Sequence, residues 1–309
     1  MKLQNKRILV TGAKGFLGQA LVPKLKEEGV DVWTFPSKHY DLRSEKETKR
    51  LLKDSGPDAV IHLAVDGGGI GYMKENPGSV FYNNVMMNTN ILEQSRLSGI
   101  EKFVGIGSVC SYPKITEVPF KEEDLWEGYP EETNASYGLS KKMMMVQGQS
   151  YHQQYGFNAI HLLPVNMYGP RDDFDLDNSH VIPALIRRMI EAKENKDKGI
   201  VLWGSGSASR EFLYVDDCAD AIIKATKHYD KPDPINVGAG DEITIKNLAQ
   251  KIQDLVGFKG NLVWDTTKPD GQPRRCLDVY KAHKEFGFKA TTNFDKGLRE
   301  TIEWYKKSM

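Results

Sequence analysis

The chain has 309 residues, which is enough for one large domain or for two domains that share a core. Lysine plus arginine equal aspartate plus glutamate at 42 each, so the charge gives no reason to expect nucleic acid or a membrane surface as a partner. Three cysteines stand far apart, at positions 110, 218 and 276, and predict neither a disulfide framework nor a metal site. No apolar run is long enough for a membrane helix and a strand begins almost at once, so we expect a cytoplasmic protein without a signal peptide.

Short apolar runs alternate with longer amphipathic segments in the first half of the chain. The apolar runs predict strands buried on both faces at residues 7–11, 30–35, 59–64, 103–108 and 159–164. Helical spacing of apolar residues predicts helices at residues 16–29, 81–98 and 136–155. Strands that alternate with helices of this length indicate βαβ units, so we predict an α/β fold of the Rossmann type with a doubly wound parallel sheet.

The character of the sequence changes after Gly169-Pro170. Loops lengthen, and short strand-like pieces separate helices predicted at residues 179–193, 215–227, 245–256 and 294–306. We expect residues 1–168, joined by about 211–236, to form the larger Rossmann domain. Residues 169–210 and 237–309 then form a smaller α/β domain that binds the substrate.

A glycine-rich segment follows the first predicted strand and opens the first predicted helix. It reads Gly12-Ala13-Lys14-Gly15-Phe16-Leu17-Gly18, a G-x-x-G-x-x-G pattern. Glycines there permit a tight turn and a close approach of the backbone to a pyrophosphate, which then lies at the positive end of the helix. A glycine triplet alone is also found in ordinary turns, but its place between a buried strand and a helix predicts a dinucleotide site.

The choice between NAD and NADP depends on the end of the second strand. An acidic residue there would hold the ribose 2′-hydroxyl of NAD, yet the stretch 34–38 contains no acid and the first one is Asp41. Lys14 and Lys38 are available to pair with a 2′-phosphate, although both are also typical of a solvated surface. We therefore predict NADP(H) as the cofactor of the first domain.

Three residues predict hydride transfer at a carbonyl carbon. Tyr137 and Lys141 are four residues apart and share one face of a helix. A free phenol has a pKa of about 10 and is a poor acid or base at neutral pH, whereas a nearby ammonium group lowers that pKa. Ser108 ends a predicted parallel strand, where open α/β sheets bind ligands, and its hydroxyl can bond a carbonyl oxygen. The Y-x-x-x-K spacing is common by chance, but together with the glycine loop and Ser108 it indicates an oxidoreductase.

With these motifs the chain resembles the extended short-chain dehydrogenase/reductases that act on nucleotide sugars. The resemblance covers nearly the whole chain. It implies contacts with the adenine and nicotinamide sides of the cofactor from Asp41-Leu42, His62-Leu63-Ala64 and Asn83-Asn84. It also implies cofactor contacts from Pro164, Asn166 and His180.

Cys110 and His180 suggest a second kind of chemistry. Cys110 stands two residues after Ser108, and His180 opens a helix in the second half of the chain. Hydride transfer needs neither a thiol nor an imidazole, whereas moving a proton beside a ketone needs a base and an acid, which a Cys–His pair can supply. The simpler interpretation makes Cys110 a small buried side chain and His180 a surface residue at a helix start.

The stretches around this pair resemble the GDP-L-fucose synthase group of that family. They are residues 107–114, 168–170, 178–188, 203–206, 210–212 and 268–271. The resemblance implies that Cys110 is the base and His180 the acid for epimerisation at C3 and C5 of a GDP-4-keto-6-deoxy-hexose. It implies that Tyr137 then protonates the C4 oxygen during reduction by NADPH, which gives GDP-L-fucose.

The same resemblance implies a substrate site and an assembly. The substrate-binding positions are Ser108, Val181, Arg188, Trp203, Arg210 and Asp270. Arginines can pair with a diphosphate and an indole can cover a base or a sugar, although the sequence does not distinguish guanine from uracil or thymine. In this family the helices that correspond to 81–98 and 136–155 form a homodimer contact, and Met143-Met144-Met145 fits such a helix interface.

Two departures and two alternative functions remain open at this point. Arg171 stands where the family commonly has His, and Asp66 adds an acid beside the glycine run 67–69; both could line the sugar pocket. One alternative is another nucleotide-sugar enzyme, such as a 4-reductase, 4-epimerase, 3,5-epimerase or 4,6-dehydratase. The other is a catalytically idle NADP-binding sensor, which would not be expected to keep both Tyr137 and Lys141.

Overall fold

A six-stranded parallel sheet forms the centre of the larger part of the molecule in this computed structural model, which describes residues 1–176, 179–268 and 270–309. The strand order is β2-β1-β3-β4-β5-β9, with bounds Asp31–Trp33, Arg7–Thr11, Ala59–His62, Lys102–Ile106, Ala159–Pro164 and Ile235–Val237. Every neighbouring pair is parallel, and the order reverses direction at β1. The predicted α/β Rossmann fold with a doubly wound sheet is therefore confirmed.

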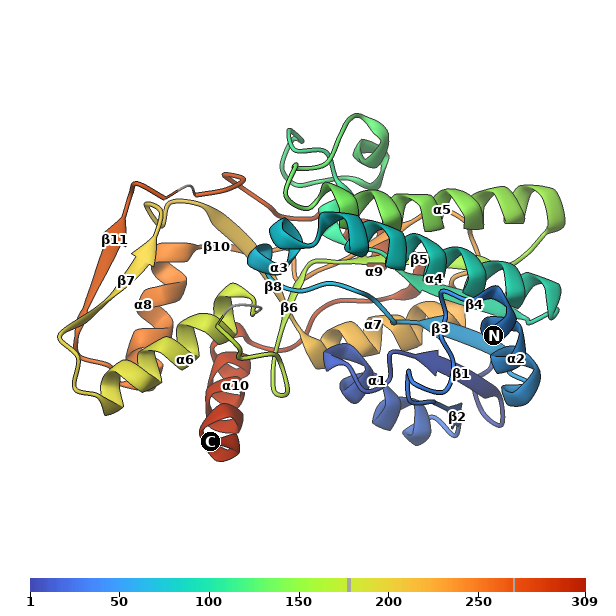
Figure 1. Ribbon diagram of the computed structural model, residues 1–309, viewed down its shortest axis with the longest axis horizontal. Helices are drawn as coiled ribbons and strands as arrows, with labels where there is room; N and C mark the ends of the chain where they lie inside the picture. The colour runs from blue at the N-terminus through green and yellow to red at the C-terminus, as the bar shows by residue number, and fades with distance from the viewer. Residues whose placement is uncertain (177–178, 269) are drawn as a thin grey trace.

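Helices cover both faces of this sheet, as Figure 1 shows. One face carries α1 (Phe16–Glu27) and α7 (Val215–His228), and the other carries α2 (Glu45–Ser55), α4 (Pro77–Leu97) and α5 (Ala135–Tyr155). Successive strand residues enter opposite layers: Ile8 and Val10 join the core under α1, whereas Leu9 joins the core under α4. A strand with two covered faces must be apolar throughout, which is why the continuous apolar runs predicted these strands.

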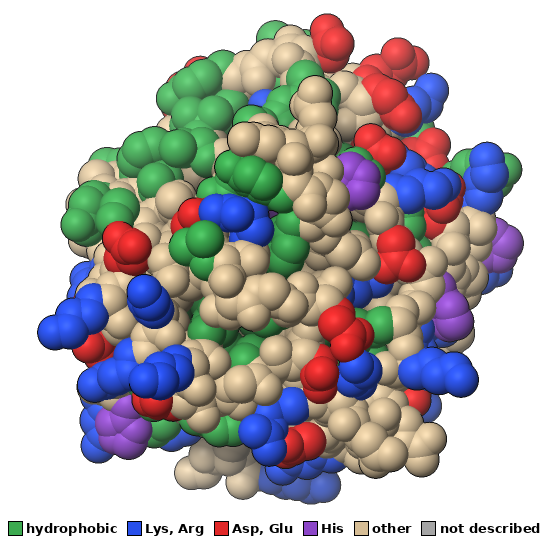
Figure 2. All heavy atoms as spheres, turned by 90° about the vertical axis from the view of Figure 1, so that its right-hand side faces the viewer, with side chains coloured by type: hydrophobic (Ala, Val, Ile, Leu, Met, Phe, Trp, Pro, Cys, Tyr) green, Lys and Arg blue, Asp and Glu red, His purple; other side chains and the backbone are tan. Residues whose placement is uncertain are grey.

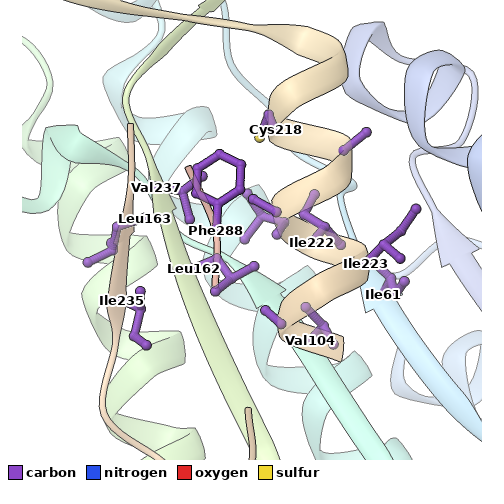
Figure 3. Close-up of a cluster of buried hydrophobic side chains, with 14 of the residues drawn as sticks. Ile61, Val104, Leu162, Leu163, Cys218, Ile222, Ile223, Ile235, Val237 and Phe288 are labelled. Carbon is purple, nitrogen blue, oxygen red and sulfur yellow. The ribbon is translucent and has the colours of Figure 1, made fainter. Parts of the chain in front are cut away.

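The layer under α7 shows how tightly this core is filled. Cys218, Ile222 and Ile223 of α7 pack against the strands near the side chains of Ile61, Val104 and Leu162 (Figure 3). Cys218 is 1% exposed, so it serves here as a small apolar side chain.

The remaining chain builds a smaller part around its own core. It contains a three-stranded sheet in the order β10-β8-β6 (Glu242–Thr244, Ser209–Tyr214 and Asn166–Tyr168) and a two-stranded sheet of β11 and β7 (Asn261–Asp265 and Gly199–Trp203). Helices α6 (Val181–Glu194), α8 (Ile245–Val256) and α10 (Phe294–Ser308) bury their apolar faces against one another and these strands. Two further short helices, α3 (Ile70–Glu75) and α9 (Tyr280–Phe286), belong to the larger part, where Ala282 and Phe286 of α9 join its core.

Some elements differ from the sequence prediction. Helix α4 begins at Pro77, four residues before the expected start, because proline is suited to the first turn of a helix. Helix α2 was missed because its buried side chains are few (Thr48, Leu51, Leu52 and Ser55) in a charged sequence. Among the described residues, no helix is long and apolar enough to cross a membrane.

A buried histidine packs between α5 and the sheet. Side-chain atoms of His161 on β5 fill the space beside Gly105 and Gly148, and a Cβ at Gly148 would overlap the ring. Neither ring nitrogen has a hydrogen-bond partner among the described residues. Burial lowers the pKa of His161 from 6.5 to about 3, so the ring is neutral in the folded protein at neutral pH.

Acid should destabilise the protein partly through His161. Below pH 6.5 the unfolded chain binds a proton at this residue that the folded chain does not bind. The contribution of His161 to stability is therefore present above pH 6.5 and is lost as the pH falls toward 3, amounting to about 2 kcal/mol at pH 5. We predict that His161→Leu reduces the loss of unfolding free energy between pH 8 and pH 5, measured in urea titrations, by about 2 kcal/mol. An unchanged pH dependence in the variant would rule out this account of His161.

Candidate active site

The glycine loop lies at the carboxyl ends of β1 and β3. Gly12 has a φ of +68°, and a Cβ there would lie 2.7 Å from the backbone nitrogen of Ala64. A Cβ at Gly18 would lie 2.5 Å from the carbonyl oxygen of Gly12. Only glycine permits this turn and this close packing of α1 against the loop.

The start of α1 can accept an anion. Gly15 is its N-cap, no side chain caps the helix and no acidic residue lies in its first turn. The N–H groups of the first turn and the positive end of the helix dipole therefore remain available for a phosphate. Phe16 and Leu17 begin this helix; because Leu17 is buried in the core, only its backbone can serve a ligand.

A buried polar chain fixes the backbone opposite the loop. The hydroxyl of Thr11 accepts hydrogen bonds from the N–H groups of Leu63 and Ala64, each at 3.1 Å. It also lies 2.8 Å from Nδ1 of His62, whose Nε2 lies 3.0 Å from Oδ1 of Asn88. An amide oxygen only accepts, so the network assigns the ring proton to Nε2 and lets Thr11 donate to Nδ1.

Lys14 and Lys38 are exposed, whereas Asp41 is paired with Arg43. Arg43 donates to both carboxylate oxygens of Asp41, with Nη2 2.8 Å from Oδ2, and this hydrogen bonding lowers the pKa of Asp41. The charge of Asp41 is therefore largely balanced, so it repels a nearby 2′-phosphate less than a free carboxylate would.

Asp66 supports its own loop. Its carboxylate accepts hydrogen bonds from the hydroxyl of Tyr72 at 2.6 Å and from the amide of Asn83 at 2.7 Å. Arg43 extends this network because its Nη1 donates to Asn83 at 3.2 Å. The carboxylate thereby braces the glycine run beside Tyr137, whose ring lies 3.8 Å from the Cβ position of Gly67.

Helix α5 docks directly on the loop that carries Ser108 and Cys110. A Cβ at Gly138 would overlap the carbonyl oxygen of Cys110, and the hydroxyl of Ser111 donates to the carbonyl of Gly138 at 3.1 Å. Ser108 caps the short helix η1 (Val109–Ser111), and its hydroxyl accepts from the N–H of Cys110 at 3.1 Å. The missing side chain at Gly138 thus brings Tyr137 up to Ser108 and Cys110.

The environment changes the acidity of Tyr137 and Lys141. Burial and the neighbouring Cys110 raise the pKa of Tyr137 above its usual value, and a hydrogen bond with Ser108 opposes this shift. Lys141 is 2% exposed, its Nζ lies 5.6 Å from the centre of the Tyr137 ring, and burial lowers its pKa to about 8. Tyr137 is thus a protonated acid at neutral pH and Lys141 a cation near its point of deprotonation.

Two arginines face Cys110 from the other side. Nη1 of Arg275 donates to Sγ of Cys110 at 3.8 Å. Burial and then Arg275 lower the pKa of Arg210 to about 10, while Asp270 and Cys110 favour its charge. Two cations therefore lie near the thiol that neighbours Tyr137.

His180 lies at the N-cap of α6, next to residues that the structure does not describe. The His180 side chain is exposed to solvent. Neighbouring protein atoms still desolvate the ring in part, which lowers its pKa, and Asp173 opposes that shift. In the described parts of the chain, no hydrogen bond joins His180 to Cys110 or Tyr137. Burial raises the pKa of the nearby Asp172 to about 7.

The residues predicted for the nucleotide end lie in the smaller part. Val181 begins α6, and the guanidinium of Arg188 donates to the carbonyl of Val201. Trp203 is 69% exposed, with Nζ of Lys268 5.7 Å from its ring centre. Asp270 accepts from the N–H of Ser205 at 2.6 Å and so fixes the turn after Trp203. Asn178 and Pro269, which belong to the matching stretches, lie outside the described residues.

The structure brings most of the predicted catalytic residues together. Ser108, Cys110, Tyr137 and Lys141 form one cluster, which Arg210 reaches from the smaller part. Asp270 lies near Arg210 and bonds to Ser205. Pro164 ends β5 at the carboxyl edge of the central sheet, and Asn166 begins β6 of the three-stranded sheet two residues later. Arg275 and Gly138 were not predicted from the sequence. A glycine directly after the tyrosine is a visible signal, whereas nothing local marks Arg275.

Fold and site together define a dinucleotide-dependent oxidoreductase of the short-chain dehydrogenase/reductase type. Residues 8–238 match the NAD dependent epimerase/dehydratase family. A GDP-L-fucose synthase from Sinorhizobium fredii is 42% identical over 302 residues, which are 97% of this chain and 96% of that protein. The chain belongs to the NAD dependent epimerase/dehydratase family, and the resemblance to GDP-L-fucose synthases is confirmed.

Solved structures agree with this assignment. A GDP-6-OMe-4-keto-L-xylo-heptose reductase from Campylobacter jejuni superimposes with a TM-score of 0.93 at 30% identity, covering 99% of both chains. A GDP-L-fucose synthetase from Naegleria fowleri bound to NADP gives a TM-score of 0.88 at 32% identity, covering 99% of this chain and 95% of that one.

Proposed function

We propose that this protein converts a GDP-4-keto-6-deoxy-hexose to GDP-L-fucose by epimerisation at C3 and C5 and NADPH-dependent reduction at C4. The observation that carries the proposal is the position of Cys110 beside Ser108 and Tyr137, since a plain reductase needs no thiol there. Relatives that are GDP-L-fucose synthases over their whole length support the substrate and the product.

The residues of the glycine loop fit NADP. Gly12, Gly15 and Gly18 leave the backbone open to a pyrophosphate, and Lys14 and Lys38 supply positive charge for a 2′-phosphate. Leu63 and Ala64, held by Thr11, line the opposite side, with Asp41, Pro164, Asn166 and His180 as further contacts. The bound cofactor supplies the hydride for the reduction.

Ser108, Tyr137 and Lys141 act in the reduction. The hydroxyls of Ser108 and Tyr137 hold the C4 carbonyl oxygen, and Tyr137 gives its proton to that oxygen as the alkoxide forms. The raised pKa of Tyr137 keeps it protonated until that moment. The ammonium of Lys141 lies near the ring and stabilises the resulting phenolate.

Cys110 and His180 act before the reduction. The C4 ketone acidifies the hydrogens on C3 and C5, so a base can remove each proton while the electron pair moves toward the C4 oxygen. We assign Cys110 as the base on one face and His180 as the acid that returns a proton on the other. Inversion must come first, because reduction removes the ketone on which it depends.

The smaller part binds the GDP group in this proposal. Arg188 and Arg210 pair with the diphosphate, Trp203 covers the base, and Val181 and Asp270 shape the pocket. We take residues 1–168 with about 211–236 as the NADP-binding domain and residues 169–210 with 237–309 as the substrate-binding domain. Separate buried cores support two such domains, but Leu277, Ala282 and Phe286 of the second range pack in the larger core. Strand β8 contributes to both cores, with Leu213 in the larger one and Phe212 in the smaller one.

Isotope exchange tests the function directly. In D2O with GDP-4-keto-6-deoxy-mannose and NADPH, we expect NADPH oxidation and deuterium at C3 and C5 of the product, measured by absorbance and NMR. Cys110→Ser should lose the exchange by about 100-fold and still bind NADPH. Oxidation without deuterium would identify a plain 4-reductase, the second candidate that the heptose reductase structure favours. Without any oxidation, both candidates fail.

We also infer that the protein is a homodimer whose subunits meet through α4 and α5. We infer that it is located in the cytoplasm. These helices carry exposed apolar side chains, among them Met143 and Val146 (46% and 47% exposed). Figure 2, which looks at the right-hand end of Figure 1, shows hydrophobic side chains gathered at its upper left. Exposed apolar patches of this kind mark interfaces. Three free cysteines and the use of NADPH fit a reducing compartment.

A single charge should separate the protomers. Val146→Glu places an uncompensated carboxylate in the proposed interface and should halve the mass measured by light scattering. Val263→Glu on β11 is the matched control, because this valine is 51% exposed and far from α4 and α5 in Figure 1. If the native chain is already a monomer, the inferred dimer is wrong.

A further inference from the structure

Arg275 contacts the sulfur of Cys110 across 165 residues of sequence. Its Nη1 donates to Sγ at 3.8 Å, and its Nε donates to Oε1 of Gln272 at 3.1 Å. Gln272 in turn donates to the carbonyl of Lys114 at 3.0 Å, on the same loop as Cys110. The guanidinium of Arg275 is therefore held at Cys110 directly and at Lys114 through Gln272.

The backbone around Arg275 is fixed as firmly as its side chain. Its carbonyl accepts from the N–H of Glu211 at 3.1 Å, and the carbonyl of Pro273 accepts from Ser209 at 2.9 Å. The buried carboxylate of Glu211 also accepts from the N–H of Leu277 at 2.7 Å. Segment 273–277 thus runs along β8, and this pairing aims Arg275 at the thiol.

The charges that face Cys110 are mainly positive. Arg275 and Arg210 approach from the side of β8, Tyr137 of α5 is uncharged, and Asp270 lies near Arg210. Asp270 is held by two hydrogen bonds from Ser205, 2.6 and 2.7 Å long. A sulfur in such a setting is stabilised as an anion, because a guanidinium keeps its charge at every relevant pH.

We propose that Arg275 is a positioning residue that holds Cys110 as a thiolate ready to take a proton. This inference rests on the proposed function of Cys110 as the base. In that step the C–H bond at C3 or C5 breaks, its electron pair moves toward the C4 oxygen, and the proton forms a new S–H bond. A thiol cannot accept that proton, so the site needs the thiolate before the substrate reacts.

Alkylation of Cys110 tests the proposal without any sugar substrate. Iodoacetamide is uncharged and reacts with the thiolate, and mass spectrometry follows the Cys110 peptide separately from the buried Cys218 and Cys276, whose pKa values burial raises to about 12. In Arg275→Gln the alkylation rate at pH 7 should fall about tenfold, because the sulfur loses its cationic hydrogen-bond partner. Arg275→Lys should restore most of the rate.

Arg274→Gln is the matched control. The adjacent Arg274 is 58% exposed and pairs with Glu242, so its loss should leave the alkylation rate of Cys110 unchanged. Thermal melting checks that each variant is folded, and Arg275→Met is a second uncharged variant if Arg275→Gln does not fold. An unchanged alkylation rate in a folded uncharged variant, with or without a raised KM for the sugar nucleotide, would overturn the proposal. Because the assay contains no substrate, its outcome is independent of whether the proposed reaction occurs.

Discussion

The site depends on the absence of one side chain. Gly138 lets the first turn of α5 press against the carbonyl of Cys110, and any Cβ there would collide with it. That contact brings the helix of Tyr137 and Lys141 to the loop of Ser108 and Cys110. Proton transfer beside the substrate ketone and hydride addition to that ketone can then take place in one site.

The electrostatic surroundings give Tyr137, Lys141 and Cys110 different roles although they lie close together. Cys110 and burial keep the proton on Tyr137, whereas Lys141 is ready to stabilise the phenolate. Arg275, in the segment held along β8, and Arg210, in β8 itself, both lie near the sulfur. An acid and a base can coexist within one cluster because the surrounding charges favour opposite protonation states.

Local sequence was sufficient for the Rossmann fold, because strands covered on two faces are continuously apolar and the helices between them are long. It was also sufficient for Gly12 to Gly18 and for Tyr137 with Lys141, whose spacing is set within one loop or one helix. Arg275 could not be predicted, since its contact with Cys110 depends on how segment 273–277 pairs with β8. Helix α2 was missed because few of its residues are buried, and the role of Asp66 became clear only from its bonds with Tyr72 and Asn83.

The central claim is that one site binds the C4 ketone for two separable reactions, epimerisation and reduction. The variant Tyr137→Phe tests this claim most directly. The variant keeps Ser108, Cys110 and His180 but loses the acid for the C4 oxygen. In D2O with GDP-4-keto-6-deoxy-mannose and NADPH, NMR of the recovered sugar should show deuterium at C3 and C5, while NADPH oxidation falls by about 100-fold or more. Loss of exchange in step with loss of reduction, in a folded variant that still binds NADPH, would contradict the claim.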